Sequence, residues 1–190
     1  MFHFVSSTEL DFLLSMTIRK LHIGGITPHD EWEIFNALEE PFVDHTGDAR
    51  DLSRFSDHTF ESVYASHVLE HFDYNGEVQA VIREWTRVLA PKGKLYISVP
   101  DMETLCRLYL DRVQFDDQIR FGIMRMMFGG HIDQYDYHLI GFDLNLLRDM
   151  LMEAGYREIW KMDDFGLFDD TSVLSLGGQR ISINVMAVKD

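Results

Sequence analysis

The sequence predicts an α/β protein in which helices cover both faces of a mainly parallel β-sheet. β-rich segments alternate along the chain with segments of helical periodicity, and this alternation is typical of parallel strands joined by helical crossovers. The chain has 190 residues, of which 46% are hydrophobic and only four are prolines. This is enough to bury a substantial core. We therefore expect one domain over residues 18–190, preceded by an N-terminal extension over residues 1–17.

Four β-rich segments precede the first clear helix, at residues 19–25, 31–35, 41–45 and 60–66. The first of them runs into the pair Gly24-Gly25, and the fourth alternates in polarity as a half-buried strand does. Only eight residues separate Ile23 from Trp32, whereas a helical crossover usually needs a dozen or more. The first connection therefore departs from the usual pattern.

Helices and strands then alternate to the end of the chain. The clearest helix carries apolar residues at helical spacing, namely Val78, Val81, Ile82, Trp85, Val88 and Leu89. Two further helices are expected to begin after the N-caps Asp101 and Asp143, the second ending at Gly155, and another spans residues 117–128. The remaining strands are expected at residues 94–100, 156–162 and 180–188.

Charge and composition exclude several classes of function. The chain has 17 basic and 32 acidic residues, a formal charge of -15, which repels nucleic acid and anionic membranes. Cys106 is the only cysteine, so the chain has neither an internal disulfide nor a thiolate zinc cluster. No apolar run approaches the roughly 18 residues of a membrane span, and the acidic first residues do not resemble a secretory signal. We therefore expect a cytoplasmic protein.

The segment "SHVLEHF" contains His67, Glu70 and His71 at the spacing of an inverted zinc-protease signature. A zinc site would need a sustained helix and a third ligand. His67 instead follows a predicted strand directly, and Asn75-Gly76 interrupt any helix soon afterwards. We therefore expect no metal here. The carboxyl end of a strand is where open α/β sheets bind ligands, so either these histidines hydrogen-bond within the turn or at least one faces a ligand.

Three segments together resemble the class I S-adenosylmethionine-dependent methyltransferases: "GDARDL" (47–52), "FESVYASHVLEHF" (60–72) and "EWTRVLAPKGKLYISVPD" (84–101). More narrowly, the chain is similar to a small group of bacterial predicted methyltransferases, type 11-like, that open with "LHIGG" and carry "FGG" before a loop rich in tyrosine and histidine. The resemblance covers residues 18–189. It implies a Rossmann-like, doubly wound sheet of about seven strands with an antiparallel last strand.

The resemblance also implies that S-adenosylmethionine lies across the carboxyl ends of the first four strands. It places seven residues at this cofactor: Gly24, Gly25, Asn36, Asp48, Ala49, Ser66 and His67. The glycines match the loop that lets the backbone approach the methionine end. The asparagine stands where an acid usually binds the ribose hydroxyls, and Asp48 with Ala49 matches the stretch that contacts the adenine. The last two residues match the position after the fourth strand.

The acceptor side is predicted from loops that follow strands. The candidate catalytic residues are His67, His131 and His138, and the candidate acceptor-binding residues are His71, Asp101, Tyr135 and Tyr137. A histidine could serve as base at neutral pH if the acceptor must lose a proton. We expect His131 or His138 to contribute more than Asp101, which already caps a helix. The acceptor is expected to be a small molecule, and a hydroxyl of a sugar or related metabolite is a candidate for the methylated group.

Other interpretations remain open at this level. The chain could be a non-catalytic module that keeps the fold and binds the cofactor, and residues 124–128 could form a homodimer contact as well as core. A nicotinamide-dependent oxidoreductase is disfavoured because no G-x-G-x-x-G opens a helix after the first strand. A zinc hydrolase is the least favoured.

Overall fold

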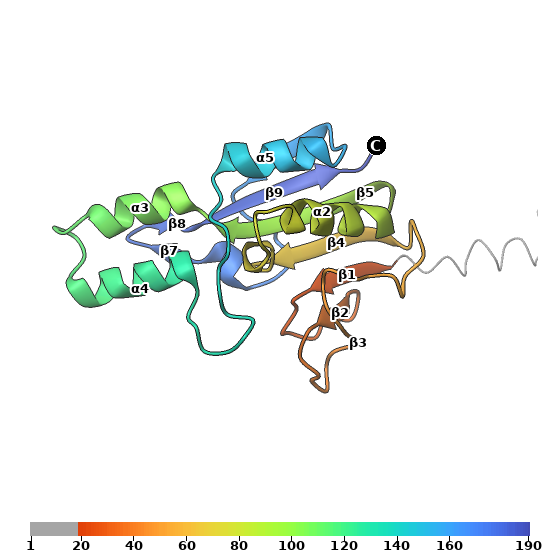
Figure 1. The fold of residues 1–190 in the computed structure, drawn as a ribbon, viewed down its shortest axis with the longest axis horizontal. Helices are drawn as coiled ribbons and strands as arrows, with labels where there is room; N and C mark the ends of the chain where they lie inside the picture. Colours follow the sequence, from red (N-terminus) through yellow and green to blue (C-terminus); the bar gives the residue numbers. More distant parts are fainter. Residues whose placement is uncertain (1–18) are drawn as a thin grey trace, which may run out of the picture.

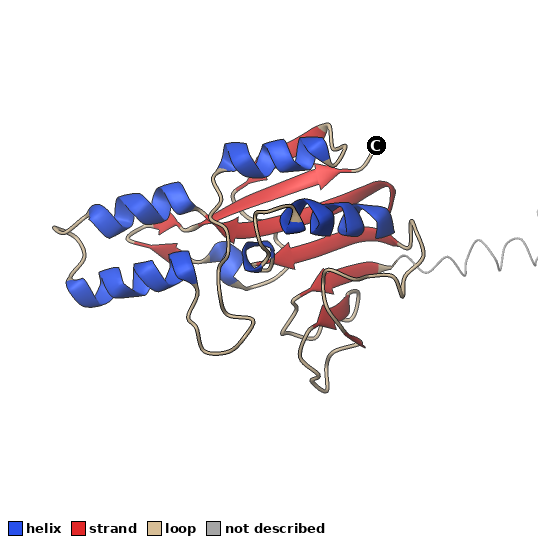
Figure 2. Ribbon diagram, viewed as in Figure 1, coloured by secondary structure: helices blue, strands red, loops and turns tan. Residues whose placement is uncertain are grey.

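A computed structural model describes residues 19–190 and confirms the predicted fold class (Figures 1 and 2). The expected N-terminal extension, residues 1–17, lies outside the described residues. Seven strands form one sheet in the order β3-β2-β1-β4-β5-β9-β6. Their bounds are Lys20–Ile23 (β1), Glu33–Asn36 (β2), His45–Thr46 (β3), Phe60–Ser66 (β4), Leu89–Pro100 (β5), Glu158–Met162 (β6) and Ser182–Val188 (β9). The first five strands in this order, from β3 through β2, β1 and β4 to β5, run parallel to one another. Strand β9 runs antiparallel to its two neighbours, β5 and β6.

Four α-helices and two 3₁₀ turns connect the strands. They are α2 (Glu77–Val88), α3 (Met102–Leu110), α4 (Asp117–Phe128), α5 (Leu144–Glu153), η1 (Leu69–His71) and η2 (Thr171–Val173). The predicted N-caps are confirmed: the Asp101 side chain accepts a hydrogen bond from the Thr104 amide, and Asp143 accepts one from the Leu146 amide. Gly155 follows α5 in a left-handed conformation, as expected. Among the described residues, no helix is both long and apolar enough to cross a bilayer.

The two faces of the sheet are covered differently. Helices α2 and α5 lie side by side over one face (Figure 1). The other face carries aromatic side chains, where His22 and Tyr64 pack against Phe168 from the loop before η2. The connections at residues 24–32 and 37–44 explain the difference, because both are too short for a helical crossover. Aromatic side chains from a loop therefore replace the helices that the first two crossovers would supply, and the expectation that helices cover both faces of the sheet is met on one face only.

Two hydrophobic cores hold the described part of the chain together. The larger core lies between the sheet and helices α2 and α5, where Trp85 is fully buried and its indole nitrogen donates to the Ala49 carbonyl at 2.8 Å. The smaller core joins α3 and α4 and includes Leu108, Ile123 and Met127. The methionine-rich segment of α4 therefore contributes at least one side chain to the core, as expected.

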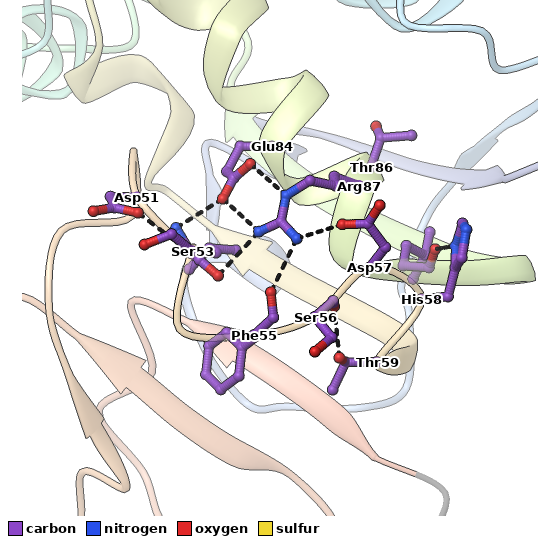
Figure 3. A network of polar contacts seen from close by, with 12 residues as sticks. Asp51, Ser53, Phe55, Ser56, Asp57, His58, Thr59, Glu84, Thr86 and Arg87 are labelled. Carbon is purple, nitrogen blue, oxygen red and sulfur yellow. Dashed lines mark hydrogen bonds and ion pairs between the residues drawn. The ribbon is translucent and has the colours of Figure 1, made fainter.

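Arg87 ties helix α2 to the loop before β4 (Figure 3). Its guanidinium makes a two-pronged ion pair with Glu84 at 2.7 and 2.8 Å and a third contact with Asp57 at 2.8 Å. The same group donates to the carbonyls of Leu52 and Phe55 at 3.0 and 2.9 Å. This loop has no regular secondary structure, so Arg87 satisfies backbone oxygens that no strand or helix pairs.

Two parts of the element prediction were wrong. The predicted strand at residues 41–45 is reduced to the two residues of β3, because the backbone turns before His45 and only Phe35 and Asn36 are paired with it. A hairpin of β7 (Ser175–Leu176) and β8 (Gln179–Arg180) was not predicted. Both glycines between its strands have positive φ, which is the geometry that a tight hairpin turn requires.

Candidate functional site

The carboxyl ends of β1, β2 and β3 meet at one edge of the sheet, which we call the rim. The amide of Gly24 donates to the Phe35 carbonyl at 2.8 Å, and the amide of Gly47 donates to the Asn36 carbonyl at 2.9 Å. Ile23 pairs with Ala65 on β4, so the glycine pair lies beside the end of that strand. The seven residues predicted for the cofactor therefore lie on neighbouring strand ends.

The glycine pair allows close backbone approach at this rim. Gly24 has φ +76°, and a Cβ atom there would lie 2.4 Å from Cγ2 of Val68. A Cβ atom at Gly25 would lie 2.9 Å from the His22 ring. Only glycine fits the first position without strain, and neither position has room for a side chain.

The polar side chains of the rim already have protein partners. Asn36 donates from Nδ2 to the Gly25 carbonyl at 2.9 Å, and its Oδ1 accepts from the Leu38 amide at 3.0 Å. Asp48 pairs with Arg50, and this guanidinium holds the pKa of the Asp48 carboxyl below its usual range. The Asp48 side chain nevertheless remains 45% exposed, so it can still contact a ligand.

Ser66 has an unsatisfied hydroxyl at the end of β4. Its Oγ is buried and has no hydrogen-bond partner among the described residues. Ser98 pairs with it on β5, and the Oγ of that residue is also buried without a partner. The Ser66 hydroxyl lies on the strand beside the glycine pair and is therefore available to a polar group of a ligand at the rim, whereas Ser98 lies one strand further from it.

His67 is held at the exit of β4 in a left-handed conformation, with φ 54°. Its amide donates to the Ser98 carbonyl at 2.8 Å, and its Nε2 lies 2.9 Å from the Ser182 hydroxyl. The turn that follows is the 3₁₀ turn η1 rather than a sustained helix, as the sequence indicated. Nδ1 of His67 lies 3.2 Å from Oε1 of Glu70, close enough for a charge interaction.

Glu70 lies at the centre of three imidazoles. Its side chain is 1% exposed, and neither carboxylate oxygen has a hydrogen-bond donor in good geometry within residues 19–190. Nε2 of His138 lies 3.9 Å from Oε1, and the rings of His71 and His138 are 5.0 Å apart. Burial acts to raise the pKa of Glu70, and the three imidazoles, His67 foremost, offset this and hold the pKa below its usual value. Burial lowers the pKa of His138.

The other predicted acceptor-side residues lie elsewhere. His131 stacks on Tyr137 with ring centroids 4.1 Å apart, and its Nε2 bonds the Phe128 carbonyl at 2.9 Å. Tyr135 and Tyr137 are each 46% exposed. Asp101 lines a separate cavity of about 480 Å³, together with charged side chains that include Arg107, Lys161 and Arg180. Ser182 lines the same cavity and contacts His67, so the cavity and the histidine cluster are neighbours.

The sequence interpretation missed the role of Glu70. It considered His67 and His71 as possible ligands and noted the glutamate only as a neighbouring carboxylate. In the structure this glutamate is buried between the imidazoles of the cluster. The i,i+3 spacing of His67 and Glu70 was a usable signal, because such residues meet in one helical turn. No local signal placed His138 beside them, since it comes from the loop after α4.

Comparison with known proteins supports the resemblance read from the sequence. Residues 33–97 match the family described as "Methyltransferase domain". No curated protein sequence matches the chain. The fold is similar to a SAM-dependent methyltransferase from Archaeoglobus fulgidus, with TM-score 0.58 and 16% identity over 96% of this chain and 92% of that one. It is also similar to the YcgJ protein from Bacillus subtilis, with TM-score 0.52 and 16% identity over 95% and 97% of the two chains.

A further similar structure is the CurJ carbon methyltransferase, with TM-score 0.53 and 16% identity. The match covers 90% of this chain and 48% of that one, so this chain spans about half the length of that protein. These similarities confirm the predicted Rossmann-like fold and the resemblance to class I enzymes.

Proposed function

We propose that this chain, which has the fold of class I S-adenosylmethionine-dependent methyltransferases, transfers a methyl group from S-adenosylmethionine to a small acceptor. The observation that carries the proposal is the topology of the rim. Strand β1 lies between β2 and β4 in the sheet. From β1 the chain first builds β2 and β3 on one side and then crosses to β4 on the other side, so the glycine pair after β1 lies where the strand order reverses. Ligands of open α/β sheets bind at such a switch point.

The residues at the rim fit this cofactor. The backbone at Gly24 and Gly25 carries no side chain that would keep a ligand away from the strand ends. The unpaired hydroxyl of Ser66 suits a polar ligand group, and the exposed carboxylate of Asp48 can accept hydrogen bonds from an adenine or a ribose. Asn36 keeps a lone pair on Oδ1 for a ribose hydroxyl while its amide nitrogen is held by Gly25.

The protein would act mainly by positioning. When bound, the cofactor supplies a methyl group on a sulfonium, which is already activated for displacement. Correct alignment of two reactants can lower a barrier by about 7–11 kcal/mol. A base adds roughly 10²–10⁴-fold only if the acceptor must lose a proton. The imidazoles of His67 and His138 are the candidate bases, because both lie at the carboxyl end of the sheet around Glu70.

The cavity beside Asp101 is the candidate acceptor site. Its lining is polar and carries both signs of charge, which suits a hydroxylated metabolite such as a sugar better than an apolar one. Ser182 connects this lining to His67, since its hydroxyl lies 2.9 Å from Nε2 of that histidine. An acceptor hydroxyl in this cavity would therefore lie near an imidazole.

A second candidate function is cofactor binding without turnover. Asn36 favours it, because this residue stands in place of an acid and its amide is already bonded to Gly25 and Leu38. A neutral amide binds a ribose diol more weakly than a carboxylate does. In this alternative the cofactor binds at the same rim as in the methyltransferase proposal, but no methyl group is transferred.

Thermal melting with S-adenosylhomocysteine tests the proposal. A ligand at about 100 times its dissociation constant adds roughly 2.7 kcal/mol, which is about 5–11 °C for a domain of this length. We expect this shift with S-adenosylhomocysteine and none with a nicotinamide dinucleotide. Absence of a shift with S-adenosylhomocysteine would refute the proposal.

Ser66→Ala and Ser98→Ala form a matched pair for the same experiment. Both remove a buried hydroxyl without a partner, and only Ser66 lies on the strand beside the glycine pair. We expect Ser66→Ala to weaken S-adenosylhomocysteine binding about tenfold, as the loss of about one hydrogen bond does, and Ser98→Ala to leave it unchanged. Transfer of labelled methyl groups to a panel of hydroxylated small molecules then separates catalysis from binding alone.

A further inference from the structure

The cluster around Glu70 has the composition of a metal site. Glu70, His71 and His138 each offer one ligand atom, and these three atoms lie within 4.8 Å of one another. Two imidazoles and one carboxylate are a donor set that zinc and related divalent ions use in proteins. In tetrahedral zinc sites such ligand atoms lie about 3.3 Å apart. Side-chain rotations that move each ligand atom by about 1 Å would therefore bring the three atoms to this spacing.

The carboxylate of Glu70 needs a cation. Its side chain is buried, and neither oxygen accepts a hydrogen bond from a described residue. A buried carboxylate without donors is costly unless a positive charge lies beside it. Nδ1 of His67 and Nε2 of His138 approach the same oxygen, Oε1, at 3.2 and 3.9 Å. An ion held by Glu70, His71 and His138 would supply the positive charge.

One histidine of the set, His71, is already oriented as metal ligands are. Nδ1 of His71 lies 3.0 Å from the Tyr137 carbonyl, which can only accept, so this nitrogen carries the proton and Nε2 keeps its lone pair. For His138, Nε2 is the ring nitrogen that lies toward Glu70, 3.9 Å from Oε1. Histidine ligands of metals typically donate their second ring N–H to such a carbonyl, which fixes the tautomer and the ring direction.

The backbone already brings the two halves of the set together. The amide of Leu139 donates to the Glu70 carbonyl at 2.8 Å, and the amide of Ile140 lies at 3.4 Å from the same oxygen. One half of the set therefore follows β4, and the other comes from the loop after α4 (Figure 1). A bound ion would join these segments.

We propose that Glu70, His71 and His138 bind a divalent transition-metal ion of the zinc class, which fastens the loop after α4 to the turn after β4. Three protein ligands leave one coordination position for water. The site is separate from the glycine rim and shares only His138 with the proposed methyl transfer. When the ion is bound, His138 is a ligand and His67 remains as the candidate base. The sequence argued against a metal because His67 follows a strand directly and Asn75-Gly76 interrupt any helix. The fold supplies a ligand, His138, from another loop.

Titration of the chelated protein tests the proposal. The full chain, prepared without a polyhistidine tag and freed of metal with EDTA, is titrated with Zn²⁺ by calorimetry and with Co²⁺ by visible absorption. We expect one equivalent to bind, and Zn²⁺ at about 100 times its dissociation constant to raise Tm by about 5–11 °C. Slower hydrogen exchange at the amides of Leu139 and Ile140 should accompany binding.

Variants of two of the three ligands, together with one control variant, test the assignment. His138→Ala and Glu70→Gln should each weaken Zn²⁺ binding by at least about tenfold and remove the metal-induced rise in Tm. His131→Ala is the matched control, because it removes an imidazole from the same loop outside the cluster. Glu70→Gln keeps the shape of the side chain, so it carries the test if His138→Ala fails to fold. The proposal is overturned if the wild-type chain binds no stoichiometric metal, or if Glu70→Gln binds as tightly as His131→Ala.

Discussion

Arg87 illustrates how one side chain can hold a loop that has no regular structure. Its guanidinium binds two carboxylates and two backbone carbonyls (Figure 3). Lysine keeps the charge but cannot reproduce this planar geometry. We expect Arg87→Lys to lower the free energy of unfolding by about 1.5–3 kcal/mol, measured by urea denaturation. Arg83→Lys, on the exposed side of the same helix, should change it by less than about 0.5 kcal/mol.

His22 makes the stability of the fold depend on pH. Burial lowers the pKa of His22 to about 4, and Asp170 and His29 modify it in opposite directions. The unfolded chain titrates near pKa 6.5, so it binds more protons than the folded state between these values. Stability is therefore lost as the pH falls from about 6.5 to about 4, by about 1.6 kcal/mol between pH 6.5 and pH 5.

The variant His22→Leu tests this contribution. Nδ1 of His22 is buried and has no hydrogen-bond partner in the described part of the chain, so an apolar side chain of similar size should be tolerated at pH 7. Urea denaturation of wild type and variant at pH 7 and pH 5 measures the difference. We expect the variant to lose less stability at the lower pH. Equal losses in the two proteins would mean that His22 does not contribute.

Residues at strand ends could be placed from the sequence, and residues that meet through loops could not. Gly24, Asn36 and Ser66 follow segments with a clear β pattern, and parallel strands bring their carboxyl ends to one edge. His138 was expected in the acceptor loop, but its approach to Glu70 depends on the path of the chain after α4. No periodicity encodes such a path, because loop contacts depend on the packed elements around them.

At the scale of elements, the glycine pair after β1 restricts how the chain leaves the sheet. Gly24→Ala should cost about 1–3 kcal/mol for the positive φ, and more for the contact with Val68. Gly76→Ala is the matched control, because Gly76 has φ +97° and nothing within 4 Å of its added Cβ. The difference between the two variants, measured in urea, gives the cost of the contact.

The double variant Gly24→Ala with Val68→Ala separates these effects further. Removing the Val68 side chain should recover the part of the loss that comes from the close contact and leave the part that comes from φ. If the loss of unfolding free energy in the double variant is at least the sum of the losses in the two single variants, the Val68 side chain does not clash with an added Cβ at this position. In that case the glycine would be needed for its φ alone.

Elements with a cap or a long apolar period were predicted to within a few residues. Helices α3 and α5 begin after Asp101 and Asp143 as expected, and β4 has the predicted bounds. The short edge elements were not predicted correctly. Strand β3 has only two paired residues, and each strand of the hairpin β7–β8 also has only two. A strand of two residues is too short to show an alternation of apolar and polar residues, and it forms only where a neighbouring strand pairs with it.

At the scale of the whole molecule, the two hydrophobic cores differ in size. The larger core takes in the sheet with α2 and α5, and the smaller one is confined to α3, α4 and the residues around Ile181. Helix α4 also exposes apolar side chains, Phe121 at 59% and Phe128 at 54%. Less buried apolar surface holds α3 and α4 in place, so local opening there should require less free energy than opening of the sheet.

Hydrogen exchange measured by mass spectrometry tests this difference. We expect amides of α3 and α4 to exchange faster than those of β4, β5 and α2 in the wild-type chain. Leu108→Ala should speed exchange in α3 and α4 alone, whereas Leu151→Ala, an equally buried leucine of the larger core, should speed it throughout the sheet. Uniform acceleration by both variants would mean that the two cores unfold as one unit. A local effect of Leu108→Ala would instead identify α3 and α4 as the part of the chain that opens first.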